Sequence, residues 1–203
     1  MEFFIPERQV IFEEEIKKSR FITYLNHTQG IEQARAFWAE MKSLHPQARH
    51  HCWAAVAGMP TDSLQYGFSD DGEPSGTAGK PMLNCLLGSG VGEISAVVVR
   101  YYGGILLGTG GLVRAYSHGV QQALAQLARR CKILRQPYRL QCSYEQFRTI
   151  QHLCQEYDIE IIEQQFCEKV VLRLGINPSH FADISQQITQ RFSGQLNLIA
   201  EEM

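Results

Sequence analysis

ISAVVVRYYGGILLGTGG, residues 94–111, is the stretch of sequence that decides the fold of the first part of this chain. Its unbroken run of apolar, mostly β-branched residues predicts a strand over Ile94–Tyr102 that is buried on both faces and therefore lies inside a sheet. The glycine-rich turn that follows opens a helix over Leu112–Leu127, whose apolar residues recur on one side. We expect Arg129–Lys132 to close this helix, because positive charge suits the carboxyl end of the helix dipole.

Several shorter elements precede this strand, and together they indicate a mixed α+β domain. Two strands are expected over Gln9–Glu15 and Phe21–Leu25, where β-branched and aromatic residues gather. Apolar residues spaced by three and four predict a helix over Gly30–Leu44, which Pro46 ends. The remaining elements are a strand over His51–Ala57, an irregular loop over residues 66–81 with no core to explain it, and a short helix over Met82–Leu87.

A second domain follows, and its elements come in a simple order. The expected elements are strand Tyr138–Cys142, helix Tyr144–Tyr157, strands Ile159–Glu163 and Lys169–Ile176, helix Pro178–Phe192 and strand Gln195–Ala200. This βαββαβ order is that of a ferredoxin-like fold. Proline near the start of the second helix and Ser193-Gly194 at its end support these boundaries. We therefore expect an α+β protein of two domains, residues 1–131 and 132–203.

Composition restricts the class of protein. The chain has 203 residues, of which 44% are hydrophobic and 20% charged, as in an ordinary globular protein that is long enough for two small domains. No apolar stretch approaches the roughly 18 residues that span a bilayer. The six cysteines are widely spaced and form no C-x-x-C pair. We expect a cytoplasmic protein that does not contact membranes.

Neither domain carries an excess of positive charge. Residues 1–131 hold 12 Lys plus Arg against 12 Asp plus Glu, and residues 132–203 hold 7 against 9, which gives the net charge of -2. Proteins that bind phosphates non-specifically usually have a strong positive excess. Any contact with nucleic acid must therefore depend on a local basic patch.

The end of the central strand and the glycine-rich turn supply the first group of candidate residues. Glycines before a helix leave backbone amides free to bind an anion, and arginine beside tyrosine can pair with a phosphate and stack on a base. A tight turn with packed tyrosines, and Arg100 paired with Asp70 or Glu73, explains the same residues. The candidates for binding nucleic acid or another anion are Lys80, Arg100, Tyr101, Tyr102, Gly103, Gly104, Gly110, Gly111 and Arg114. We expect the segment around Ser69–Lys80 and the stretch Arg100–Gly111 to converge into a single polar cleft that can hold an anion.

Known nucleotide-binding motifs do not fit these glycines. The stretch GTGGLV, residues 108–113, lacks the last glycine of the dinucleotide fingerprint, and no acidic residue follows at the expected distance. The stretch GTAGKP, residues 76–81, is no P-loop, because Pro74 stands in place of the first glycine and Pro81 in place of the magnesium-binding hydroxyl residue. Lys80 lies near the expected start of a helix, where it can still contact a phosphate. We expect no cofactor.

The acidic residues Asp70, Asp71 and Glu73 offer three oxygen donors within one loop, which hard cations such as Mg²⁺ prefer. A solvated turn is the favoured explanation of these residues, since aspartate and glycine are common in turns for conformational reasons. His51 and Cys52 are adjacent in a strand and would point to opposite faces, which disfavours a zinc site. No serine or cysteine stands in a pattern typical of an activated nucleophile, so an enzyme is unsupported.

Four segments resemble the signature of the IMPACT family. They are KSRF (residues 18–21), HCWA (51–54), FSDDGEPSGTAGKP (68–81) and VRYYGGILLG (99–108). The resemblance covers most of Ser19–Leu127, and the whole chain resembles the bacterial YigZ branch of the family. It implies a first domain like the second domain of ribosomal protein S5, a βαβ arrangement also found in the fourth domain of the translocating elongation factor. The second domain resembles the fifth domain of that factor.

The resemblance also directs the functional hypothesis. Eukaryotic relatives are implicated in translational control through a regulator of an initiation-factor kinase, and they carry a different extra domain that this chain lacks. The leading hypothesis is a non-enzymatic binding protein linked to translation, which contacts RNA, the ribosome or a ribosome-associated protein. One alternative is a metal-dependent hydrolase or phosphotransferase that uses the acidic loop. The other is a protein–protein adaptor, which predicts an exposed apolar patch near Leu106 and Leu107.

Overall fold

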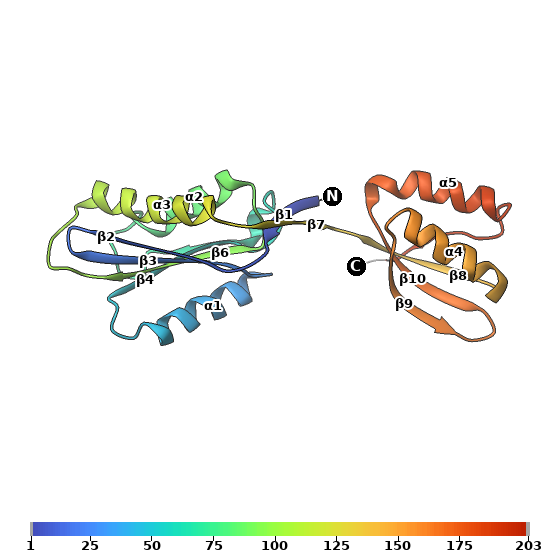
Figure 1. The fold of residues 1–203 in the computed structure, drawn as a ribbon, viewed down its shortest axis with the longest axis horizontal. Coiled ribbons are helices and arrows are strands. Elements are labelled where there is room, and N and C mark those ends of the chain that lie inside the picture. The colour runs from blue at the N-terminus through green and yellow to red at the C-terminus, as the bar shows by residue number, and fades with distance from the viewer. Residues whose placement is uncertain (1, 202–203) are drawn as a thin grey trace. The chain divides into compact units, whose positions relative to one another are not determined.

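The computed structural model describes residues 2–201, and these form two compact units. One unit, called here the N-terminal unit, is Phe3–Lys132. The other, the C-terminal unit, runs from Ile133 onward and includes Glu2. Each unit mixes helices with sheet, which confirms the predicted α+β class with two domains (Figure 1).

A five-stranded antiparallel sheet forms the middle of the N-terminal unit. Its strands, in spatial order, are β2 (Val10–Ile16), β3 (Ser19–His27), β6 (Ile94–Tyr101), β4 (His50–Val56) and β5 (Tyr66–Ser69). Strand β6 lies at the centre, and Val97, Val98 and Val99 are wholly buried. This confirms that the apolar run is covered on both faces of the sheet.

Helices cover the two faces of this sheet unequally. Helix α1 (Ile31–Leu44) lies on one face, and α2 (Gly79–Ser89) and α3 (Thr109–Ala125) lie on the other (Figure 1). Strands β3 and β4 are joined by α1 and both pair with β6 between them, which is a split βαβ arrangement. None of the helices in the described part of the chain combines the length and the hydrophobicity that a bilayer-spanning segment needs.

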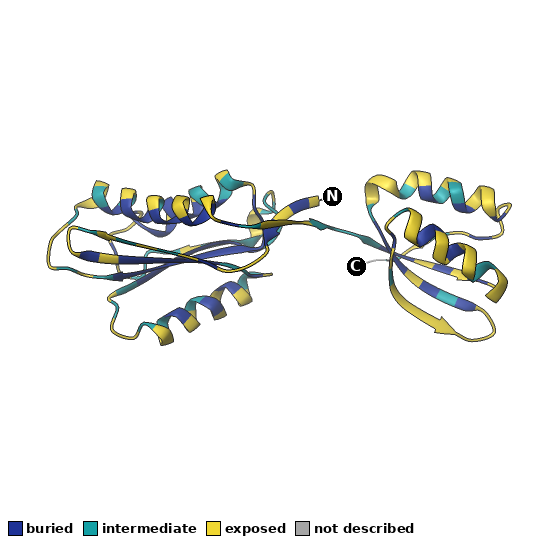
Figure 2. Cartoon of the chain, in the orientation of Figure 1, coloured by how far each residue is buried: buried dark blue, intermediate teal, exposed yellow. Residues whose placement is uncertain are grey.

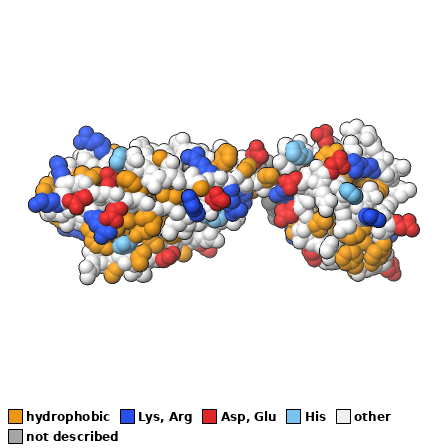
Figure 3. Space-filling model, in the orientation of Figure 1, with side chains coloured by type: hydrophobic (Ala, Val, Ile, Leu, Met, Phe, Trp, Pro, Cys, Tyr) orange, Lys and Arg blue, Asp and Glu red, His pale blue; other side chains and the backbone are white. Residues whose placement is uncertain are grey.

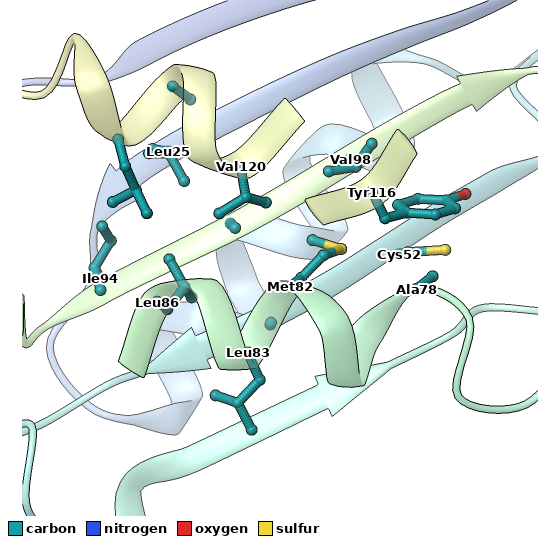
Figure 4. Packing of buried hydrophobic residues seen from close by; sticks show 14 of the residues in the cluster. Leu25, Cys52, Ala78, Met82, Leu83, Leu86, Ile94, Val98, Tyr116 and Val120 are labelled. Carbon is teal, nitrogen blue, oxygen red and sulfur yellow. The ribbon is translucent and has the colours of Figure 1, made fainter. Parts of the chain in front are cut away.

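Two apolar cores result from this layering. The larger lies under α2 and α3, where Met82, Leu86 and Val120 are completely buried against the sheet (Figure 4). The smaller lies under α1 and includes Phe37 and Met41. The exposed faces of the helices carry polar residues, so burial alternates along each of them (Figure 2).

The C-terminal unit is the predicted ferredoxin-like fold. Its elements are β8 (Gln136–Cys142), α4 (Tyr144–Glu156), β9 (Glu160–Phe166), β10 (Val170–Ile176), α5 (Phe181–Arg191) and β11 (Ile199–Ala200). The sheet order is β11-β8-β10-β9 with every pair antiparallel. Ser143 and Gln146 form a capping box at the start of α4. A single 3₁₀ turn, Pro178–His180, precedes α5.

Several elements differ from the prediction, and the last strand is shorter than expected, Ile199–Ala200. Helix α3 ends at Ala125, and the basic stretch expected to close it belongs to a strand, β7 (Arg129–Ile133), which pairs with β1 (Glu2–Pro6). The helix stops early because Leu127 turns into the core and the Ala128 carbonyl accepts a hydrogen bond from the Glu7 amide. The predicted irregular loop begins with strand β5 and packs against the core through Ala78, which is fully buried.

Two glycines of α2 provide a matched test of this packing. A Cβ atom on Gly79 would lie 2.9 Å from backbone atoms of Ser69, whereas one on Gly88 would meet nothing within 4 Å. We expect Gly79→Ala to destabilise the N-terminal unit by about 1–3 kcal/mol through overpacking. Gly88→Ala should be neutral or stabilise it by up to about 1 kcal/mol through helix propensity.

Urea unfolding followed by tryptophan fluorescence measures both effects, because Trp38 and Trp53 are the two tryptophans of the chain and both lie in the N-terminal unit. Equal unfolding midpoints for the two alanine variants would show that the close approach of α2 to β5 is not a constraint.

Candidate functional site

Two segments distant in sequence line one hollow in the N-terminal unit. Gly72–Pro74 of the loop forms one wall, and Arg100, Tyr102 and Leu106–Thr109 form the other. The hollow has a volume of about 380 Å³ and is completed by Arg49, His50 and Leu112. We call it the cleft. The predicted convergence of the acidic loop with the stretch before α3 is therefore present, although much of the cleft wall is aliphatic.

Arg100 lines the cleft but exposes almost none of its surface there. Its side chain is buried, and its Nη1 atom donates a 2.6 Å hydrogen bond to Glu73 Oε1 within a buried ion pair. Tyr116 also donates to that oxygen, at 2.8 Å. The prediction that Arg100 meets a ligand phosphate directly is revised, since Glu73 already neutralises its charge. The predicted alternative, that Arg100 pairs with Glu73, is what the structure shows.

One atom of this arginine is left without a partner. Among the described residues, the buried Nε of Arg100 has no hydrogen-bond acceptor. A buried donor without a partner costs about 1–3 kcal/mol, so this atom lowers the stability that the ion pair contributes.

The two tyrosines that follow Arg100 point to opposite faces of the sheet, as neighbours in a strand must. Tyr101 lies on the α1 side, where its hydroxyl is 2.8 Å from His45 Nδ1. Tyr102 lies in the cleft, with the guanidinium carbons of Arg49 and Arg100 5.7 and 5.4 Å from its ring centroid. The predicted grouping of both tyrosines at one edge is therefore revised, and only Tyr102 belongs to the cleft.

Sequence reasoning did not predict that Arg49 and His50 would line the cleft. They reach the cleft because β4 pairs with β6: His50 is opposite Arg100, and the Arg49 amide donates to the Arg100 carbonyl at 3.1 Å. Arg49 is exposed, and no described residue forms an ion pair with it. His50 Nδ1 is 2.8 Å from the Asp71 carbonyl oxygen, which orients its ring. Only knowledge of the strand register could have placed these two residues.

The first turn of α3 opens onto the cleft. Gly108 occupies the N-cap position with φ 74°, a conformation that favours glycine, and it offers no side chain to cap the helix. The amides that begin α3, including those of Gly110 and Gly111, therefore have no side-chain cap, and the positive end of the helix dipole faces the cleft. Gly104, at φ 84°, makes the bend that leads to this turn.

The corresponding amides of α2 are already occupied. The carboxylate of Asp70 accepts hydrogen bonds from the amides of Gly76, Ala78 and Gly79 at 2.8, 3.0 and 2.8 Å. An acidic residue outside the helix thus caps it, which explains why α2 starts before Met82. Lys80 lies over the Phe68 ring, 5.9 Å from its centroid, and is not among the residues of the cleft.

The remaining acidic residues of the loop are also engaged by protein donors. Asp71 accepts from Lys42 Nζ at 2.9 Å and from the His51 amide at 2.7 Å, while Glu73 is paired with Arg100. The expectation that Asp70, Asp71 and Glu73 present oxygens to one cation is revised, because each serves a different partner. Within residues 2–201, no group of His, Cys, Asp or Glu side chains is arranged to hold a metal ion.

Gly103 and Arg114 are not among the residues that line the cleft. The Gly103 amide donates to Ser19 Oγ at 3.2 Å, and a Cβ atom on Gly103 would lie 2.0 Å from the Lys18 carbonyl oxygen, so only glycine fits there. Arg114 is exposed and lines a separate hollow of about 630 Å³ beside α3. Leu107 lines both this hollow and the cleft.

The stretch before α3 exposes apolar side chains. Leu106 is 81% exposed and Ile105 41% exposed, whereas Leu107 is partly buried against the core. Of the two exposed apolar residues, Leu106 lines the cleft.

The buried groups beside the cleft are not built as nucleophiles. Burial raises the pKa of the Cys52 thiol and of the Tyr116 hydroxyl, and Cys52 donates to the Asp70 carbonyl. Their side chains lie next to one another and to Ala78 in the core (Figure 4). Burial also raises the pKa of Cys85. A thiol with a raised pKa stays protonated at neutral pH and reacts poorly.

A split βαβ sheet with a glycine-rich turn into α3, followed by a ferredoxin-like unit, defines the class to which this chain belongs. The Impact N-terminal domain family matches residues 17–124, and a family described as Domain of unknown function (DUF1949) matches residues 140–195. The chain belongs to the IMPACT family.

Similar proteins match the chain along nearly its whole length. It is 62% identical to an IMPACT family member of Haemophilus influenzae, over 96% of this chain and 95% of that protein. It is 55% identical to the IMPACT family member YigZ of Escherichia coli, over 98% and 97%. A crystal structure described as that of an hypothetical protein is 54% identical, with a TM-score of 0.76 over 99% of this chain and 98% of that one. The resemblance predicted from sequence motifs is confirmed.

The buried ion pair gives a prediction about stability. Glu73→Ala leaves Arg100 charged and unpaired inside the protein, so we expect it to destabilise the N-terminal unit by about 3–5 kcal/mol. The double variant Glu73→Leu with Arg100→Met removes both charges and should recover most of that loss, because an apolar pair of similar volume needs no counter-ion. Urea unfolding followed by tryptophan fluorescence checks both values. A Glu73→Ala variant as stable as the wild type would contradict the role given to this pair.

The thiols give a prediction about reactivity. Because burial holds the pKa of Cys52 above its usual range, very little thiolate forms there at pH 8, and burial raises the pKa of Cys154 to about 11. Iodoacetamide at pH 8 should therefore label the exposed Cys167 in the native protein while leaving Cys52 unmodified until urea is added. Peptide mass spectrometry measures the extent of labelling. Labelling of native Cys52 as fast as that of Cys167 would mean that the core around Cys52 opens readily.

Proposed function

We propose that this chain is a binding protein linked to translation, without catalytic activity, and that its N-terminal unit contacts RNA through the cleft. The observation that carries the proposal is the meeting, in one hollow, of an exposed arginine, an aromatic ring and a helix start without a side-chain cap. Arg49 supplies the charge, Tyr102 the ring and α3 the amides. These are the groups that bind a phosphate and stack on a base.

RNA fits this arrangement better than a free nucleotide does. The cleft has no P-loop, since Asp70 occupies the amides at the start of α2, and Lys80 lies outside it. The exposed cations Arg49, Lys80 and Arg114 are spread over separate parts of the surface. A chain of phosphates can contact several such cations at once, whereas a single phosphate cannot. Membership of the IMPACT family supports the link to translation, with the ribosome or a ribosome-associated protein as the setting for such contacts.

The alternative of a metal-dependent enzyme is disfavoured, because the carboxylates that would bind the metal ion, Asp70, Asp71 and Glu73, each have a protein partner. A protein–protein adaptor would bind its partner through the exposed side chain of Leu106. The affinity of such an apolar contact should change little with salt, which distinguishes it from RNA binding.

Arg49→Ala tests the cleft, since Arg49 is exposed whereas Arg100 is buried. We expect its affinity for single-stranded RNA to fall by about three- to tenfold at roughly 100 mM salt, and the slope of log K against log salt to become shallower by about 0.7, the value for one lost phosphate contact. Fluorescence anisotropy with labelled structured and single-stranded RNA across a salt series measures both quantities.

Arg35→Ala is the matched control, because Arg35 is an exposed arginine on α1, which covers the other face of the sheet. If Arg49→Ala lowers the affinity for RNA no more than Arg35→Ala does, the cleft is not where RNA binds. A weak wild-type affinity that does not change with salt would defeat RNA binding as a whole.

A further inference from the structure

The turn between β2 and β3 is built from residues that do not suit its backbone. Ile16 pairs with Ser19, so Lys17 and Lys18 alone form a two-residue hairpin turn, with φ of 47° and 65°. Positive φ at both central positions is the type I′ pattern, which asparagine and glycine favour. Lysine adopts this conformation only at a cost in stability. A strained backbone held by charged residues points to a function for those charges.

The strained turn is held firmly against the stretch before α3. The Lys18 carbonyl packs on Gly103 so closely that no Cβ atom would fit between them, and the next residue, Ser19, accepts a hydrogen bond from the Gly103 amide at 3.2 Å. The two lysines are therefore fixed in position relative to the segment that leads into the cleft.

The charges of this turn are free to meet an external anion. Lys17 and Lys18 are exposed, and none of the described residues forms an ion pair with either of them or with Arg114. Two carboxylates of the adjacent strand are directed away from the turn: Glu13 is paired with Arg20 on the opposite face of the sheet, where Glu15 also points by alternation. Glu14 lies on the side of α3 and is paired with His118, which lines the hollow beside that helix. Lysine and arginine side chains gather at this end of the N-terminal unit, at the left of Figure 3.

The turn borders the hollow beside α3 that Arg114 lines. Lys17 and Arg114 both line it, between the aliphatic side chains of Ile16, Leu107 and Val113. Its volume of about 630 Å³ lies within the range of ~300–1,000 Å³ found for small-ligand pockets. Because Leu107 also lines the cleft, a single extended ligand can lie in both hollows by passing over the first turn of α3.

We infer that Lys17, Lys18 and Arg114 form a second phosphate-contacting site for the same single-stranded RNA. This inference rests on the proposed function, because it extends the RNA from the cleft. A nucleotide matches cations beside an aliphatic hollow, because its phosphates pair with the cations and its ribose and base cover the apolar wall. An acidic polypeptide would use the charges but leave the open amides of α3 and the Tyr102 ring without a matching group.

The double variant Lys17→Asn with Lys18→Gly tests this site, since it removes the charges and gives the turn the residues that it favours. We expect the midpoint of tryptophan-monitored thermal unfolding to rise by about 2–8 °C. RNA affinity should fall by about tenfold at roughly 100 mM salt, with a salt slope shallower by about 1.4, the value for two lost contacts. Oligouridylates of about 4 and about 12 nucleotides, near the limits of known single-strand sites, serve as probes, and only the longer should lose affinity.

Two controls separate charge from structure. Lys17→Arg with Lys18→Arg keeps the charges in the strained turn and should bind as the wild type does. Arg8→Ala with Arg35→Ala removes two exposed charges elsewhere in the N-terminal unit and should leave binding unchanged.

The outcomes also separate this inference from the proposed function. If wild-type RNA binding is lost on Arg49→Ala but unchanged in the asparagine–glycine variant, the second site is overturned and the cleft stands. If the wild type binds neither oligonucleotide, both are overturned. If polyglutamate displaces the RNA as effectively as unlabelled RNA of equal charge, the ligand is an acidic polypeptide and the inference is wrong.

Discussion

The buried ion pair between Arg100 and Glu73 is the interaction on which the cleft depends. It joins the last part of the central strand to a loop that has little regular structure, and Tyr116 of α3 adds a hydrogen bond to the same carboxylate. Three parts of the unit thus meet at one oxygen atom. A buried charge without its partner is strongly unfavourable. Arg100 belongs to the buried central strand, so its position also fixes the position of the loop that carries Glu73.

The two helices that cover this face of the sheet begin in contrasting ways. The Asp70 carboxylate accepts hydrogen bonds from the first amides of α2, so these amides already have a negatively charged partner. Gly108 leaves the start of α3 without such a group. The same loop therefore closes one potential anion site and forms a wall of the other. This difference, rather than the number of glycines in either stretch, decides where an anion can bind.

The fold could largely be predicted from the sequence, because it follows from periodic burial: the central strand, the helices on both faces and the whole C-terminal unit each carry their own pattern. Strands β1, β5 and β7 could not be, since short strands depend on partners that are distant in sequence. The candidate site could be predicted from the sequence only in part. The convergence of its two segments was predicted, but Tyr101 and Arg49 were misplaced or missed because their positions depend on strand register. Sequence likewise does not reveal that Asp70 caps α2, whereas the pairing of Arg100 with Glu73 was one of the predicted alternatives.

The loop over residues 70–78 is fastened from both sides of the sheet, by Lys42 of α1 through Asp71 and by Arg100 through Glu73. Such a segment cannot act as a lid, because opening it would break two ion pairs in separate layers at once. The rim it forms is thus rigid before any partner arrives, and association needs little ordering of the protein. Recognition at this surface should be closer to lock-and-key than to folding upon encounter, with the flexibility residing in the partner.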